Sequence, residues 1–177
     1  STQSVKVEAR DLATGDVVAV GTARHPATTP PSSEQDPRAW WDALTEATAE
    51  LGDVRGDVVA ISIAGQQHGC VLLDDAGEPV RPAKLWNDTT SADEAAALVA
   101  SFGAETWAKR TGLVPVASFT ISKLAWVAAH EPDALARATR VMLPHDYLTW
   151  RLTGEHVTDR GDASGTGWFD PTTDTVL

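Results

Sequence analysis

The chain has 177 residues, of which 42% are hydrophobic, so it is long enough for one well-packed domain and too short for two full ones. Its 25 acidic and 14 basic residues give a net charge of −11, which argues against nucleic acid and anionic membranes as partners because both attract positive surfaces. The single cysteine, the lack of a signal-peptide pattern and the lack of an apolar run of about 20 residues favour a reducing, cytoplasmic setting.

The first residues predict a β-hairpin. Val5–Arg10 alternates apolar and polar side chains, as a half-buried strand does, and Val17–Ala23 supplies the second strand after a glycine-containing turn. The first strand begins at once and the sequence stops at Val176-Leu177, so we expect a segment trimmed from a longer polypeptide at both ends.

A loop rich in proline, serine and threonine leads from the hairpin into a helix. Asp36 is the predicted N-cap, and Pro37 occupies the first helical position, where its missing N–H costs nothing. Spacings of four, three and four residues predict one apolar face, formed by Trp40, Leu44, Ala47 and Leu51.

The next segment combines an apolar run with a polar turn. Val58–Ala64 is predicted to be a buried strand. Gly65-Gln66-Gln67-His68-Gly69 follows directly, and a polar pair between two glycines is poor core material. Open α/β sheets present side chains to ligands at the carboxyl ends of their strands, so this turn predicts a small-molecule site.

Short strands and helices alternate through the remainder. Gly69–Leu73 is predicted to be a strand, and Ser91 with Glu94 forms a predicted capping box at the start of a helix. The inner face of that helix is predicted to hold Ala95, Leu98, Val99 and Phe102. Later predicted elements are a helix over Ile121–Ala129 with Leu124 and Ala128 inward, a helical turn over Pro132–Ala138, a strand over Arg140–Leu143, and a helix from Asp146 to Leu152 with Gly154 as its C-cap. This order predicts an α/β domain with a mixed sheet.

An ordered set of motifs extends over nearly the whole chain. They are Ser1–Val7, Glu34–Trp41, Gly65–Gly69, Leu85–Asp88, Ser118–Val127, Leu143–Leu148, Arg151–Glu155 and Thr158–Thr166. In content and order these segments resemble the FGGY family of sugar kinases. The histidine of the polar turn and the Leu-Trp-Asn-Asp block resemble most the branch that phosphorylates xylulose.

The resemblance implies an actin-like, ribonuclease-H-like fold of two domains facing a cleft. Residues 1–177 would form the sugar-binding N-terminal domain, and the ATP-binding domain would lie outside the sequence. The implied reaction is phosphoryl transfer from ATP, with Mg²⁺, to the 5-hydroxyl of D-xylulose. The resemblance places the catalytic Asp beyond residue 177, so we expect no catalytic residue, no tightly bound cofactor and no activity in this polypeptide alone. A homodimer of the full-length enzyme is compatible with the resemblance.

Five residues are predicted to contact the sugar: Gln67, His68, Trp86, Asn87 and Asp88. His68 is predicted to hydrogen-bond a sugar hydroxyl, because its flanking glycines and strand-end position favour a site over a core histidine. Gln67 stands where the resembling enzymes often have Met, so it either donates to the sugar or indicates another ketose or an alditol.

The second polar segment has two interpretations at each position. Trp86 either stacks on the sugar or fills space beneath the cleft. Asn87 and Asp88 either contact the sugar or hydrogen-bond the backbone at a helix entry. Thr2 matches the threonine of the family's phosphate turn, so its hydroxyl and N–H are predicted to face the nucleotide phosphates.

Other titratable residues predict little chemistry. Asp159 and Asp162 are expected in a solvated loop without a neighbouring metal ligand, and Asp162 is not expected to be the base. The other histidines are scattered, which argues against a zinc cluster, and Cys70 is predicted to be a small buried apolar residue.

Two further classes of function stay open. One is a non-catalytic, actin-like domain that binds a sugar or a protein. The other is a carboxylate-based glycoside hydrolase, which would need paired acids on facing elements, whereas the acids here fall mainly on turns and helix starts.

Overall fold

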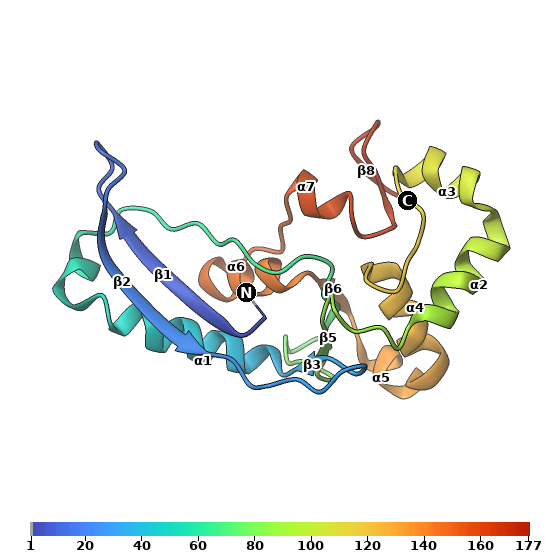
Figure 1. Cartoon of the computed structure of the whole chain (residues 1–177), viewed down its shortest axis with the longest axis horizontal. Helices are drawn as coiled ribbons and strands as arrows, with labels where there is room; N and C mark the ends of the chain where they lie inside the picture. The colour runs from blue at the N-terminus through green and yellow to red at the C-terminus, as the bar shows by residue number, and fades with distance from the viewer. Residues whose placement is uncertain (1) are drawn as a thin grey trace.

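The computed structural model describes residues 2–177, so Ser1, the first residue of the predicted phosphate segment, lies outside it. The chain spreads along one long axis, with the opening hairpin at one end and helices α2 (Ala92–Phe102) and α3 (Ala104–Thr111) at the other (Figure 1). Helix α6 (Pro144–Thr153) lies between them. Strands and helices are mixed, which confirms the predicted α/β class. None of the helices in residues 2–177 is long and apolar enough to cross a membrane.

The hairpin and the first helix pack as one unit. Strand β1 (Ser4–Arg10) pairs antiparallel with β2 (Val17–Arg24), and α1 (Pro37–Ala49) lies against both strands. The Asp36 carboxylate accepts the N–H of Arg38, which confirms the predicted N-cap. All four residues of the predicted apolar face are buried, namely Trp40, Leu44, Ala47 and Leu51.

The central core joins two further strand pairs to α6. Strand β4 (Val71–Leu73) pairs with β6 (Arg140–Met142), and β3 (Glu34–Gln35) pairs with β5 (Ala83–Lys84). The buried side chains of this core are Trp40, Val71, Leu73, Ala83, Leu85, Met142 and Tyr147. Gly154 ends α6 with a φ of 78°, which confirms the predicted C-cap.

Three more α-helices, a 3-10 helix and two short strands complete the described elements. They are η1 (Gly52–Asp57), α4 (Thr120–His130), α5 (Pro132–Arg137), α7 (Arg160–Ala163), β7 (Phe169–Asp170) and β8 (Thr175–Val176). Helices α3 and α7 and the final hairpin were not predicted from the sequence. Helix α2 packs on α4, and α4 on α5.

The predicted buried strand over Val58–Ala64 is wrong for the described chain. The segment crosses the molecule without regular structure, and Val59 and Ile61 are 78% and 57% exposed. Each sheet in residues 2–177 has two strands, and none of them pairs with this segment. An apolar run specifies a strand only where a neighbouring strand supplies backbone hydrogen bonds, and that neighbour is missing here.

The predicted capping box at α2 is also wrong. The Ser91 hydroxyl donates to the carbonyl oxygen of Ala117, 3.0 Å away, and caps no helix N–H. The Glu94 carboxylate lies 2.8 Å from His130 Nε2 on α4. Tertiary partners therefore outcompete the local hydrogen bonds that the spacing suggests.

Two predicted inward faces need correction. Ala95 is buried, but Phe102 is 59% exposed and packs edge-on against Trp107 of α3. In α4 the exposed Ala128 does not face the core, and Val127 does. A one-residue error rotates a helical face by about 100°, because an α-helix has about 3.6 residues per turn.

The close approach of the hairpin to α1 depends on Gly21. A Cβ atom at this position would collide with the carbonyl oxygen of Ala47, a backbone atom that cannot rotate away. We predict that Gly21→Ala lowers the free energy of unfolding by about 1–3 kcal/mol in urea titrations, since overpacking of this kind costs that much. Gly56→Ala is the control, because no atom lies within 4 Å of a Cβ there. Equal stability of the two variants would contradict the packing described.

Candidate functional site

The polar turn Gly65–Gly69 lies directly on the first residues of α6. A Cβ atom on Gly65 would lie 2.8 Å from Cβ of His145, and one on Gly69 would lie 2.5 Å from Cγ of Pro144. Both distances are too short for real carbon contacts, so only glycine allows the turn to sit this close. The glycines therefore fix the turn on the helix, and the polar residues between them are held in place.

His68 is held by its backbone and by two neighbours. It is a non-glycine residue in the left-handed region, with a φ of 58°. Its ring meets the Phe119 ring edge-on, with 4.8 Å between centroids. The ring also lies over Gly165, where a Cβ atom would collide with it. His68 is half-buried, and its Nδ1 has no hydrogen-bond partner within residues 2–177.

The surroundings of His68 favour the neutral form of its ring. Burial lowers the pKa of His68 below its ordinary 6.5, Asp162 opposes this shift, and the Lys123 ammonium adds to it. A neutral imidazole has one N–H donor and one lone-pair acceptor. His68 can therefore accept one hydrogen bond and donate another at neutral pH.

The two glutamines of the turn differ. Gln67, the predicted sugar contact, is exposed. Gln66 was not predicted, yet its Oε1 is buried and has no hydrogen-bond partner within the described residues. The only sequence signal for Gln66 was its place beside Gly65 at the end of the apolar run.

The second polar segment, Trp86-Asn87-Asp88, borders a cavity of about 750 Å³. The Trp86 indole N–H donates to Thr2 Oγ1 at 3.0 Å, which brings two predicted site residues together. Asn87 lines the same cavity, and its Oδ1 is a buried acceptor without a partner in residues 2–177. The cavity lining comprises Thr2, Gln3, Ser4, Arg24, His25, Pro26, Ala27, Thr28, Trp86 and Asn87.

Asp88 is fully buried, and protein groups occupy both of its carboxylate oxygens. Oδ2 accepts the N–H of Ser33 at 2.8 Å, and Oδ1 accepts the N–H and the hydroxyl of Thr90. Lys84 Nζ lies 3.2 Å from Oδ1. Burial alone would raise the pKa of Asp88, but these partners outweigh it and lower the pKa. Of the two interpretations, the backbone-bonding one fits, and we assign Asp88 no sugar contact.

Lys123 of α4 binds the backbone at Asp88. Its side chain is buried and donates to the carbonyl oxygens of Ala117 and Asp88, at 2.8 and 3.3 Å. Burial lowers the pKa of the Lys123 ammonium to about 8. The lysine therefore links α4 to the segment that carries Trp86 and Asn87.

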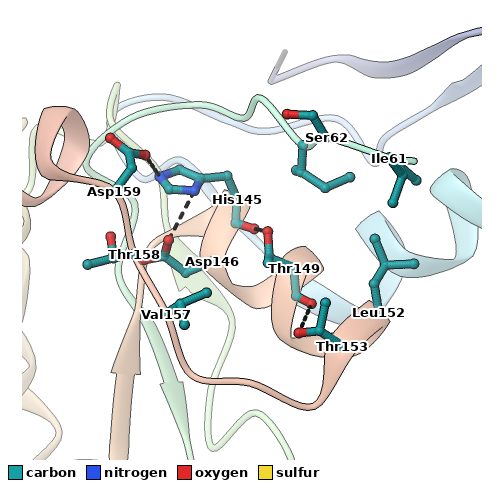
Figure 2. A pocket seen from close by; sticks show the side chains of 11 residues that line it. Ile61, Ser62, His145, Asp146, Thr149, Leu152, Thr153, Val157, Thr158 and Asp159 are labelled. Carbon is teal, nitrogen blue, oxygen red and sulfur yellow. Dashed lines mark hydrogen bonds and ion pairs between the residues drawn. The ribbon is translucent and has the colours of Figure 1, made fainter. Parts of the chain in front are cut away.

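A histidine and three acids meet beside the turn, contrary to the expectation of a solvated loop. His145 Nε2 lies 3.6 Å from Asp159 Oδ2, and its Nδ1 lies 3.0 Å from Asp146 Oδ1 (Figure 2). The same Nε2 lies 2.7 Å from Asp162 Oδ2. Burial alone would lower the pKa of His145, but the carboxylates, Asp146 first, raise it. Sequence reasoning missed this cluster because the chain after Gly154 folds back over the start of α6.

A second cavity of about 300 Å³ opens next to this cluster. Figure 2 shows Ile61 and Ser62 across from α6, with His145, Thr149 and Leu152 along the helix. Its lining combines the apolar side chains of Ile61, Ile63, Leu152 and Val157 with polar ones, among them Ser62, Thr149, Thr153, Thr158 and Asp159.

Comparisons with known proteins agree with this architecture. Residues 1–174 match the model described as the FGGY family of carbohydrate kinases, N-terminal domain. The chain is 57% identical to a xylulose kinase of Streptomyces rubiginosus over 170 residues, covering 96% of this chain and 35% of the relative. It is 43% identical to the xylulose kinase of Escherichia coli K12 over 88% of this chain and 33% of the relative.

Solved structures give the same picture. The crystal structure of a xylulose kinase from Bifidobacterium adolescentis superposes with a TM-score of 0.91 at 40% identity, covering 99% of this chain and 39% of that one. A glycerol kinase from Plasmodium falciparum superposes with a TM-score of 0.89 at 24% identity, which shows the fold alone. The chain thus spans about a third of the length of these relatives and has their actin-like fold.

The electrostatics of His68 can be tested by NMR titration of its ring. We predict a pKa below 6.5, and a further decrease in Asp162→Asn, because that carboxylate favours the imidazolium. The unfolded chain takes up this proton near pH 6.5 and the folded chain only at lower pH, so acidification below about 6.5 also costs folding stability. Asp93→Asn, on the exposed start of α2, is the control and leaves the pKa unchanged. A His68 pKa above 6.5 would refute the assignment.

Proposed function

We propose, because the chain belongs to the FGGY family of carbohydrate kinases, that it supplies the sugar-binding half of an enzyme that phosphorylates D-xylulose with ATP. The relatives cited above are named xylulose kinases, and their similarity extends over nearly the whole of this chain. The proposal concerns the complete enzyme, since the chain spans only about a third of those relatives.

One observation supports the sugar site in particular. Three buried polar atoms of the two site segments, Gln66 Oε1, His68 Nδ1 and Asn87 Oδ1, have no hydrogen-bond partner in residues 2–177. A buried polar atom without a partner costs about 1–3 kcal/mol, so native proteins rarely leave one unpaired without a functional reason. All three can accept a hydrogen bond, and the hydroxyl groups of a sugar can donate to them.

Trp86 and Gln67 contribute to the site in different ways. Trp86 is about half-exposed, and Thr2 fixes its ring through the indole N–H, so one face of the ring can cover apolar C–H groups of a sugar. Gln67 is exposed and adaptable, and we assign it the choice between D-xylulose and another ketose or alditol.

The residues near Thr2 fit the phosphates of ATP. The residues that line the 750 Å³ cavity include Thr2, Ser4, Arg24 and Asn87, whose side chains carry the kinds of N–H and O–H donors that phosphate oxygens accept. When bound, MgATP would supply the phosphoryl group and the metal charge that balances it.

We place the catalytic carboxylate outside this sequence, because Asp88 is fully paired and Asp162 faces His145. We also assign this enzyme to a reducing, cytoplasmic setting, because the single cysteine of the sequence cannot form an intramolecular disulfide.

The sugar site can be tested by titrating the chain with D-xylulose and following amide chemical shifts. We predict that residues of the polar turn and Trp86-Asn87 shift, and that His68→Ala weakens binding at least tenfold, about 1.4 kcal/mol. His156→Ala is the matched control, because His156 is exposed and lies in neither site segment. Shifts confined to another surface, or equal affinity of the two variants, would overturn the assignment.

Measurement of ADP release tests whether this chain alone can catalyse phosphoryl transfer. We predict that the purified chain, mixed with MgATP and D-xylulose, releases no ADP above background, because the proposed base is not among its residues. Sustained xylulose-dependent ADP release would show that a carboxylate of this chain acts as the base.

A further inference from the structure

We propose that His145, Asp159 and Asp162 form a binding site for a divalent transition-metal ion, with Asp146 orienting the histidine ring. The site is separate from the proposed sugar contacts and from the cavity beside Thr2. It draws its ligands from the start of α6 and from α7 with the residue that caps it.

The geometry brings three suitable ligand atoms together. His145 Nε2 and one carboxylate oxygen from each of Asp159 and Asp162 all lie within 4.8 Å of one another. An ion bound at about 2.0–2.2 Å places neighbouring ligand atoms about 3–3.5 Å apart. The observed separations of 2.7 and 3.6 Å from Nε2 bracket this range, so small side-chain rotations suffice.

Asp146 prepares the ring for coordination. Its Oδ1 faces Nδ1 of His145 at 3.0 Å, and its Oδ2 accepts the N–H of Leu143 at 3.2 Å, which holds the carboxylate in place. With the ring proton on Nδ1, the lone pair of Nε2 faces Asp159, as Figure 2 shows, and Asp162, whose Oδ2 is 2.7 Å away. A carboxylate behind a histidine in this way is the usual support of a metal-binding imidazole.

The charges also favour a cation. Three carboxylates surround His145, and a protonated ring would neutralise only one of them. No lysine or arginine in residues 2–177 forms an ion pair with Asp146, Asp159 or Asp162, and the adjacent Arg160 pairs with Asp174 instead. Nε2 is buried, on a residue that is 6% exposed, and although Asp162 Oδ2 is 2.7 Å away, Nε2 makes no well-directed hydrogen bond within the described residues. A neutral ring with a divalent ion resolves this excess of negative charge.

The surroundings leave room for an ion and its water ligands. The 300 Å³ cavity borders His145 and Asp159 and also presents the Thr158 hydroxyl. The Asp159 side chain is exposed, so an ion can enter from solvent. One imidazole nitrogen with carboxylate oxygens suits Mn²⁺, Fe²⁺ or Zn²⁺ better than Ca²⁺, which prefers oxygen ligands alone.

A bound ion would fasten α7 to the start of α6. The loop after α7 carries Gly165, on which the His68 ring rests, so the ion would stiffen one wall of the proposed sugar site.

The test uses the chelator-stripped chain titrated with Mn²⁺ and followed by electron paramagnetic resonance. Excess Mg²⁺ and salt suppress weak binding to this acidic protein. We expect one Mn²⁺ site per chain, and we expect Asp159→Asn to lower its affinity for Mn²⁺ at least tenfold. Asp159 is exposed and its Oδ1 caps α7, and asparagine keeps that acceptor, so the variant should fold. Asp93→Asn is the control and keeps wild-type affinity.

Spin-echo modulation from the bound Mn²⁺ gives a second criterion. One histidine nitrogen should modulate the signal, and His145→Gln should abolish that modulation. Absence of the site in the wild-type chain, equal affinity of wild type and Asp159→Asn, or bound Mn²⁺ without a histidine nitrogen would each overturn the proposal.

Discussion

The close contact between the polar turn and α6 is the constraint on which the proposed site depends. Gly65 and Gly69 have no side chains, so the backbone of the turn can lie against His145 and Pro144. This contact presents the glutamines and His68 in one fixed arrangement. Gly165 also allows a close contact, because the His68 ring occupies the space that a side chain at position 165 would fill. The site is therefore shaped by places where a side chain is absent.

A network of buried charged side chains lies around the segment that carries Trp86 and Asn87. Lys84 is fully buried between Asp88 and Glu34 and lies 3.7 Å from the centre of a Trp126 ring. The Asp88 carboxylate accepts the N–H of Ser33, the residue before β3, and Lys123 of α4 donates to the Asp88 carbonyl oxygen. These two bonds hold the segment that carries Trp86 and Asn87. Burying such groups is costly unless they are paired, and here each has several partners. We infer that this network serves to position Trp86 and Asn87 more than to add stability.

Local signals predicted what local interactions determine. The hairpin, the Asp36 cap and the Gly154 C-cap each rest on a few neighbouring residues, and all are present. The errors arise where distant partners decide. Val58–Ala64 has strand composition, but no strand within residues 2–177 pairs with it, and the Ser91 hydroxyl bonds to Ala117. The polar turn could be chosen as a site from sequence, whereas the unpaired Gln66 oxygen and the acids around His145 become visible only once the chain is folded.

We infer that buried polar atoms of two segments, which have no partner within residues 2–177, bind the hydroxyl groups of one sugar. A crystal structure of the chain with D-xylulose would test this inference. We expect sugar oxygens within hydrogen-bond distance of His68 Nδ1 and Asn87 Oδ1, with the Trp86 ring beside the sugar. A sugar bound elsewhere, with both atoms bonded to other protein groups, would contradict it.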